Sequence, residues 1–362
     1  MGLKKMSKSN RDKTGSEKKF FVNSESATAT AIGAVLLLGI IFSVLTFTCV
    51  FYIPEWKSDA EYSHMGDICE DMAEVKSKID MMSIVLASSP NSSSPNSPYP
   101  SSSVPQLIIS VPFHMGGGDL PLIGSIKSSG SLSVNRESCT MSIEVEPKDP
   151  DPKNPGNYSQ LINCGTITYN SHNRYYVDQN ISYENGALIL DQGEQSVMML
   201  YPSIRFSRAL DNEYSDTKYN VSINAVRIFQ KPYAPPQAIS SNAGCSLRLT
   251  GIDYRPWYDS NKKVGENLER LKLTVYTKNP DAWEQYFKKV ATDANMRVAT
   301  DANIDPNADC YIEPWNPKLY PDAEIPFVSL TFPKENSDTK KGLKGLYISE
   351  TVVKAEPGIG LN

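Results

Sequence analysis

Oxygen-bearing side chains alternate along one short segment, which runs from Asp301 through Asn303 to Asp305. This spacing resembles the front of a calcium-binding loop, in which every second residue supplies an oxygen ligand. The rest of such a loop is not matched, because Pro306 stands where the turn glycine belongs and Ile312 where the bidentate glutamate belongs. These three residues are the best metal candidate in the sequence, but we expect no specific metal site.

The histidines give no sign of catalysis. Three are present, His64, His114 and His172, and each is isolated in sequence from catalytic partners. The sequence has no H-E-x-x-H motif, no Walker lysine loop, no G-x-S-x-G elbow and no C-x-x-C pair. We therefore predict that the protein is not an enzyme and needs no cofactor, and we assign no catalytic residue.

Four sequons of the form Asn-x-Ser/Thr are candidate N-glycosylation sites. They begin at Asn91, Asn157, Asn180 and Asn220. All of them lie on the C-terminal side of the apolar stretch described below, which is the arrangement expected if that part of the chain is exported.

Of the six cysteines, Cys49 lies in the apolar stretch and Cys69 soon after it, whereas four lie in the exported body: Cys139, Cys164, Cys245 and Cys310. They allow three disulfide pairings, among which the sequence does not choose. The alternative is four free buried thiols, because cysteine also packs as a small apolar residue.

The stretch from Ala27 to Tyr52 contains no charged residue, and as a helix it is long enough to cross the hydrocarbon core of a bilayer. We predict a transmembrane helix over 27–53, with Ala27, Gly33, Leu37, Gly39 and Tyr52 as representative anchor positions. A cleaved signal peptide fits less well, because its apolar core is shorter and ends at a small-x-small site.

The charges on either side orient this helix. Lysine and arginine dominate residues 1–26, whereas aspartate and glutamate dominate the residues just after Tyr52. The positive-inside rule then predicts a cytoplasmic tail over 1–26 and an extracellular body on a single-pass anchor in the cell membrane. The formal net charge of −5 argues against a nucleic-acid partner. The apolar helix makes the lipid bilayer the expected partner.

A second helix is predicted over 54–87, in the juxtamembrane position. Its apolar residues recur every three or four positions and form one narrow seam. The seam consists of Met65, Ile68, Met72, Val75, Ile79, Met82 and Leu86. Two interpretations are open: the seam packs on the protein's own β-domain, or it mediates self-association.

The remaining sequence predicts a linker and two β-rich domains. Residues 88–105 are almost wholly Ser, Pro and Asn, which favours a solvated linker or loop. Short Val-, Ile- and Tyr-rich segments separated by turn residues predict a β-sandwich over 106–231, among them 175–177. The prolines at 232–236 suggest a boundary before a smaller α+β domain over 237–362, with a helix that starts at Asn279 and Pro280. The predicted fold class is mainly β with one long N-terminal α-helix.

The segment 23–65 resembles the N-terminal anchor of archaeal type IV pilin-like surface proteins, including archaellins, most clearly in the run Ile32-Gly33-Ala34-Val35-Leu36-Leu37-Leu38-Gly39. The run 165–192 is similar to the β-rich bodies of uncharacterised archaeal envelope proteins. The resemblance implies a helix that serves as anchor and packing element, a β-domain outside, other pilin-like subunits as partners, and no enzymatic activity. Lys18 and Lys19 lead into Phe20 and Phe21 rather than into a small residue, so the usual prepilin cut is missing.

The expected function is therefore a membrane-anchored cell-envelope protein with a structural, adhesive or pilin-like role. The alternative is an exported ligand-binding module or hydrolase displayed on a membrane anchor.

Overall fold

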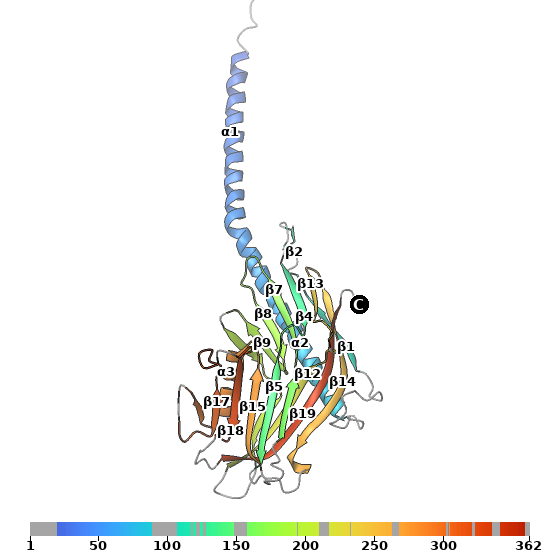
Figure 1. Ribbon diagram of the computed structural model, residues 1–362. Helices are drawn as coiled ribbons and strands as arrows, with labels where there is room; N and C mark the ends of the chain where they lie inside the picture. The colour runs from blue at the N-terminus through green and yellow to red at the C-terminus, as the bar shows by residue number, and fades with distance from the viewer. Residues whose placement is uncertain are drawn as a thin grey trace, which may run out of the picture. The chain divides into compact units, whose positions relative to one another are not determined.

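The computed structural model describes residues 20–88, 107–116, 119–120, 124–125, 128–147, 158–193, 195–209, 217–231, 233–262, 268–301, 303, 305–320, 323–334 and 341–358. The chain divides into two compact units, 1–57 and 58–362. The fold is mainly β with one long N-terminal helical segment, as predicted (Figure 1).

The first unit is helical. It contains α1 (Phe20–Phe47), a π-helical turn η1 (Thr48–Tyr52) and the start of α2 (Ile53–Ser88). The hydroxyls of Ser43 and Thr48 donate to the carbonyls of Gly39 and Val44, so they are satisfied within the helix. Every predicted anchor position lies in α1 or η1. Pro54 does not end the helix, and the π-helical turn comes just before it.

Three large sheets build the second unit. The five-stranded sheet has the order β1-β14-β19-β12-β11, and here it is called the central sheet. Its strands are β1 (Ile108–Phe113), β14 (Cys245–Asp259), β19 (Lys341–Gly358), β12 (Thr217–Ile228) and β11 (Ile204–Arg208).

The two other large sheets have six strands each. The β4 sheet has the order β10 (Ser196–Leu200), β9 (Ala187–Asp191), β8 (Asn180–Glu184), β7 (Thr166–His172), β4 (Ser129–Val134), β13 (Gln237–Ser241). The β15 sheet has the order β16 (Val298–Thr300), β17 (Cys310–Glu313), β18 (Phe327–Phe332), β15 (Leu268–Tyr276), β5 (Thr140–Pro147), β6 (Tyr158–Asn163). The remaining elements are β2 (Asp119–Leu120), β3 (Gly124–Ser125), η2 (Ser260–Lys262) and α3 (Pro280–Asp293).

Strand β12 shows how the layers share the central sheet. Val221 and Ile223 point into a core shared with the β15 sheet and α3, whereas Val226 and Ile228 point into a second core shared with α2 and the β4 sheet. Successive side chains of a strand leave opposite faces, so both faces of β12 are covered. Its parallel partner β19 is covered in the same way, which is typical of parallel strands.

The predicted boundary at 232–236 is wrong as a domain division. Strands from both sides of it pair in all three large sheets: β12 with β19, β4 with β13, and β5 with β15. The prolines lie instead in the connection that carries the chain from β12 to β13. The α+β segment over 237–362 is therefore part of one compact unit with the sandwich.

The predicted linker at 88–105 lies outside the described residues apart from Ser88.

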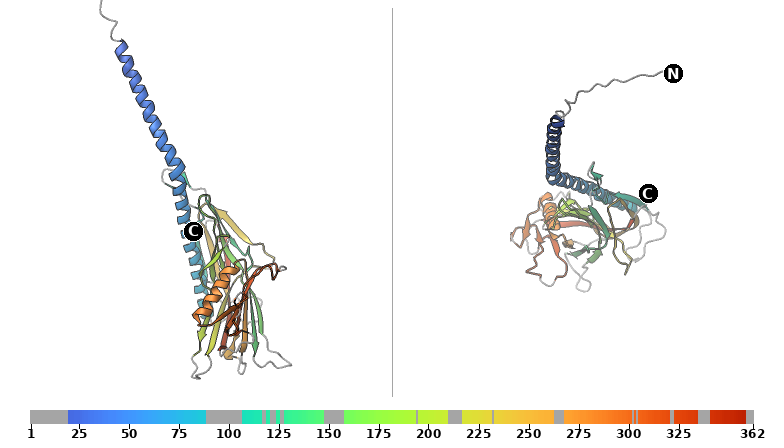
Figure 2. Two further views of the ribbon diagram at one scale, coloured as in Figure 1. Left: turned by 90° about the vertical axis from the view of Figure 1, so that its left-hand side faces the viewer. Right: turned by 90° about the horizontal axis from the view of Figure 1, so that it is seen from above.

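The seam of α2 is packed within its own chain. Six of its seven residues, from Met65 to Met82, are at most 2% exposed and belong to the second core, and Leu86 is 3% exposed. They contact side chains of the central and β4 sheets such as Val111 and Tyr169. Figure 2 shows α2 running alongside the sheets. The self-association interpretation of this seam is therefore wrong, because the apolar face already has a cover.

Candidate functional site

The outer face of the β15 sheet carries polar side chains around an open groove. On this sheet Ile143, Leu273 and Leu330 face the core, so the residues that alternate with them face outward. The groove has a volume of about 500 Å³. It is lined by Glu144, Glu146, Arg270, Lys272, Tyr311, Glu313, Thr331 and Lys334.

Strand register arranges these side chains in rows. One row runs across β5, β15, β18 and β17 through Glu144, Lys272, Thr331 and Tyr311. In a neighbouring row, which is buried under the groove's border, Thr274 donates to Ser329, and Ser329 donates to Glu313. Arg270 forms an ion pair with Glu146 at 2.9 Å between Nη1 and Oε2. The surface therefore alternates hydrogen-bond donors with acceptors and carries both signs of charge.

Two tyrosines at the groove are fixed by carboxylates. The Tyr311 hydroxyl donates to Asp301, and the Tyr320 hydroxyl donates to Glu313. The hydrogen bond to Glu313 raises the pKa of Tyr320 to about 12, and burial together with the Asp301 contact raises the pKa of Tyr311. Both phenols therefore stay protonated at neutral pH and serve as hydrogen-bond groups rather than as bases.

Partly buried aromatic rings border this region beyond Glu313. The ring centroids of Tyr320 and Phe327 are 5.0 Å apart, and those of Trp315 and Phe327 are 5.8 Å apart. Such contacts hold flat apolar surfaces in place next to the polar rows.

The three residues of the calcium candidate make local contacts in the structure. The Asp301 carboxylate accepts the Tyr311 hydroxyl, and Asp305 Oδ1 accepts the backbone N–H of Asn307 at 2.9 Å. Asn303 exchanges backbone hydrogen bonds with Thr300. No group of three or more His, Cys, Asp or Glu side chains that could hold a metal occurs among the described residues. The alternate spacing reflects local turn bonding instead.

Of the four sequons, two can be placed. Asn220 is exposed on β12, whereas Asn180 at the start of β8 is half-buried and donates to Asp191 at 3.4 Å. Asn220 is therefore the more accessible acceptor. Asn91 and Asn157 lie outside the described residues.

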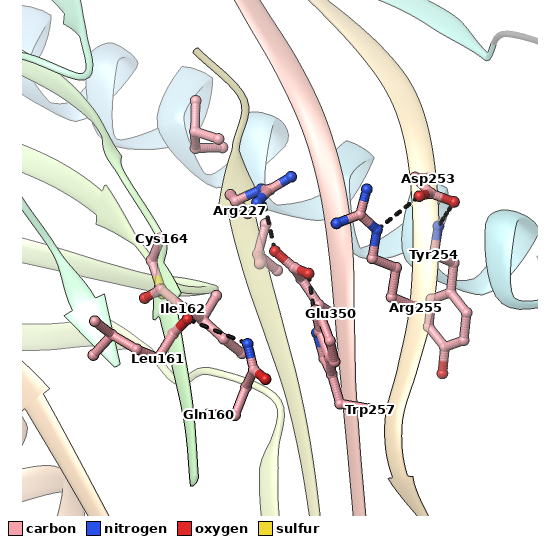
Figure 3. A network of polar contacts seen from close by, with 12 residues as sticks. Gln160, Leu161, Ile162, Cys164, Arg227, Asp253, Tyr254, Arg255, Trp257 and Glu350 are labelled. Carbon is pink, nitrogen blue, oxygen red and sulfur yellow. Dashed lines mark hydrogen bonds and ion pairs between the residues drawn. The ribbon is translucent and has the colours of Figure 1, made fainter. Parts of the chain in front are cut away.

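A buried charge network crosses the central sheet and was not foreseen from the sequence. Figure 3 shows Glu350 of β19 between Arg227 of β12 and Trp257 of β14, with distances of 3.1 Å to Arg227 Nε and 3.0 Å to Trp257 Nε1. Beside it, Asp253 pairs with Arg255 at 2.8 Å. Each carboxylate thus has a cationic partner, as buried charges require. All of these groups bond within the sheet, so we regard the network as structural.

Residues 127–320 match a family described as a family of unknown function, DUF7289. This match spans more than half of the 362 residues. The chain belongs to DUF7289. No curated protein and no solved structure matches the chain. The DUF7289 match includes six of the groove residues, from Glu144 to Glu313, but stops before β18 and β19, which complete two of the sheets.

Proposed function

We propose that this DUF7289 protein is a single-pass cell-envelope protein with a cytoplasmic N-terminus, an extracytoplasmic β-body and a structural, adhesive or pilin-like role without catalysis. The observation that carries the proposal is α1 itself. The helical segment that includes α1 is long and apolar enough to cross a membrane, and none of its most apolar 18-residue window is buried in the protein.

The exposure of α1 favours a lipid environment over a core position. Ile32, Leu37 and Phe42 are each 58–62% exposed, and their neighbours are similar. A continuous apolar surface of this size in water would associate or aggregate, whereas a bilayer covers it. The lysine-rich tail before it and the acidic residues after it support the proposed orientation.

Protease treatment of intact cells or spheroplasts tests this topology. We expect degradation of the β-body and survival of the tail, followed on blots with one antibody against each part. Lysed cells are the control, since both parts should then be cut. A body that resists protease until lysis would refute the orientation.

N-terminal mass spectrometry on protein from its native membrane tests the pilin-like aspect. Because the prepilin cut is missing, we expect the basic tail to be retained, and its charges then hold the helix in the membrane. A mature terminus between Asn23 and Ala27 would instead make a filament subunit the leading function.

The groove supplies the contact surface for an adhesive role. Its rows of carboxylates, amino groups and hydroxyls match the hydrogen-bonding pattern of sugar hydroxyls, so we propose envelope polysaccharide as its ligand. Retention of the detergent-solubilised protein on immobilised envelope polysaccharide should fall several-fold in Lys272→Glu. Lys262→Glu, an exposed lysine of η2 outside the groove, should be retained like the wild type. Equal retention of all three proteins would exclude the groove.

A further inference from the structure

Cys139 and Cys164 lie side by side where the chain passes twice between two sheets. The chain leaves the β4 sheet after β4 and enters the β15 sheet at β5, just past Cys139. It leaves the β15 sheet after β6 and re-enters the β4 sheet at β7, just past Cys164. A covalent bond between the two cysteines would therefore fasten both crossings to each other.

The two residues are directly opposed. The antiparallel register pairs Thr140 with Asn163, and the next pair outward is Cys139 with Cys164. The backbone confirms this position, because the Cys139 carbonyl accepts the Cys164 N–H at 2.8 Å and the Gly165 N–H at 3.2 Å. Opposed residues of antiparallel strands have Cα atoms roughly 4.5–5.5 Å apart, which falls within the roughly 4.4–6.8 Å of disulfides.

Both thiols are fully buried, and the Cys164 thiol donates to the Ile162 carbonyl at 3.6 Å. The contact with Cys164 and burial raise the pKa of the Cys139 thiol well above its usual range. In the folded protein the Cys139 thiol is therefore protonated, and both buried cysteines react slowly. Thiol–disulfide exchange with an oxidant requires a local unfolding that exposes one of the two sulfurs.

A buried carboxylate next to the pair tolerates loss of the thiol proton. Glu184 is fully buried and close enough to Cys139 to influence its thiol, and it accepts the Thr277 hydroxyl at 2.6 Å and the Asn279 amide at 2.8 Å. If the thiol proton is removed, two donors still satisfy the carboxylate. The Glu184 carboxylate therefore keeps hydrogen-bond partners after the two cysteines are oxidised.

A solvent route ends beside the pair. Ser138, Asn163 and Gly165, which flank the cysteines in sequence, line a surface cleft of about 420 Å³. The residues next to each cysteine in sequence are therefore in contact with solvent, although the two sulfurs are buried.

The other two body cysteines lie elsewhere. Cys245 begins β14 of the central sheet and packs in the second core. Cys310 begins β17, which pairs with β16 and β18 and not with β5 or β6, the strands flanked by Cys139 and Cys164. Burial raises the pKa of the Cys245 thiol to about 11 and that of the Cys310 thiol to about 12. Of the three pairings that the sequence allows, the structure supports only one partner for Cys139.

We propose that Cys139 and Cys164 form an intramolecular disulfide in the mature protein, while Cys245 and Cys310 remain thiols. The oxidant is a disulfide of low molecular weight or of an exchange protein. One cysteine thiolate attacks it, forms a mixed disulfide and releases one thiol. The other thiolate then attacks the protein-bound sulfur and releases the second thiol. The oxidant gains two electrons, and the two protein protons end on its two thiols.

The first test uses the full chain in detergent. Protein taken through unfolding and refolding with oxidised glutathione is alkylated under denaturing conditions, digested and analysed by mass spectrometry. We expect a cross-linked peptide pair containing Cys139 and Cys164, with Cys245 and Cys310 alkylated. Alkylation of all four, or a cross-link to another cysteine, would overturn the proposal.

Matched variants connect the bond to stability. The thermal midpoint of the oxidised wild type should fall by roughly 5–10 °C when a reductant is added. The double variant Cys139→Ala/Cys164→Ala should show no such reductant effect, whereas Cys310→Ala should keep it. If reductant did not change the thermal midpoint of the wild type, a disulfide that joins the two passages of the chain between the β4 sheet and the β15 sheet would be contradicted.

The prediction for the mature protein also rests on the proposed extracytoplasmic location. One comparison distinguishes failure of the Cys139–Cys164 pairing from failure of that location. Native membranes are alkylated at once, before purification. A pair that is oxidised there supports both proposals. If the pair forms with glutathione but is reduced in native membranes, the extracytoplasmic location fails. If it never forms, the pairing fails whatever the location.

Discussion

The Glu61 carboxylate of α2 accepts the backbone N–H of Tyr176 at 2.7 Å, although 115 positions separate the two residues. The N–H groups of Arg174 and Tyr175 point to the same carboxylate. Glu61 is fully buried. One side chain of the helix thus fixes the loop between β7 and β8, and this explains why the strand predicted at 175–177 is absent: its amides turn toward Glu61 instead of pairing in a sheet.

Replacing Glu61 by Gln should weaken the docking of this loop. The amide offers one acceptor oxygen and turns its NH2 group toward backbone donors, so buried N–H groups lose their partner. We expect the free energy of unfolding to fall by about 3 kcal/mol in urea denaturation of the detergent-solubilised protein. Glu70→Gln, at an exposed position of α2, is the control and should behave like the wild type. Equal midpoints for both variants would show that Glu61 does not hold the loop.

The seam of α2 makes a second prediction, in which two isoleucines of one helix are compared. Ile79 is 0% exposed and Ile84 is 72% exposed. Ile79→Ala leaves a cavity in the second core and should cost about 2–5 kcal/mol of unfolding free energy, whereas Ile84→Ala should change it by less than about 0.5 kcal/mol. Chemical denaturation measures both. If Ile79→Ala lowered the unfolding free energy only slightly and also abolished an oligomer, self-association through the seam would be the better interpretation.

The sequence predicted local elements well because they depend on local patterns. The seam spacing located α2, and short Val-, Ile- and Tyr-rich segments between turn residues located strands such as β5 and β12. Strands such as β8 and β11, which are short and carry Asn, Ser or Arg, were missed. The spacing of the seam showed which face is apolar, but it could not show what covers that face.

Long-range relationships were beyond the sequence for a physical reason. The partner of Glu61 is a set of backbone amides, which every residue except proline carries, so no side-chain signal marks it. The predicted domain boundary was wrong for a similar reason, because no local sequence pattern in β12 indicates that it pairs with β19. The groove did have a usable signal, because Glu144 and Glu146 alternate with core residues on one strand, as do Arg270 and Lys272 on its neighbour.

His64 should make stability depend on pH. Burial lowers its pKa below 6.5, and His114 lowers it further, while Asp67, Asp71 and Glu61 act in the opposite direction. Its Nδ1 has no hydrogen-bond partner among the described residues. The unfolded chain therefore takes up this proton at a higher pH than the folded chain, and stability is lost as pH falls below about 6.5.

Denaturation at a series of pH values checks this prediction. His64→Phe should show a shallower loss of unfolding free energy between about pH 7 and pH 5 than the wild type, because the ring no longer titrates. His172→Asn replaces an exposed histidine and should leave the wild-type slope unchanged. A wild-type slope in His64→Phe would assign the pH dependence to groups other than His64.

The buried network of the central sheet gives the last prediction, which compares two glutamates on one strand. Glu350 is 1% exposed, forms an ion pair with Arg227 and accepts a hydrogen bond from Trp257. Glu356 pairs with Lys354 where both side chains are about one-third exposed. Glu350→Gln leaves Arg227 without a counter-charge and should lower the free energy of unfolding by about 3 kcal/mol, since Arg227 retains some contact with water. Glu356→Gln should lower it by less than about 1 kcal/mol, because water screens that pair. Urea denaturation of both variants in one buffer measures the difference. If Glu350→Gln were as stable as Glu356→Gln, the network would not hold β12, β19 and β14 together, and a functional role for its charges would become the better explanation.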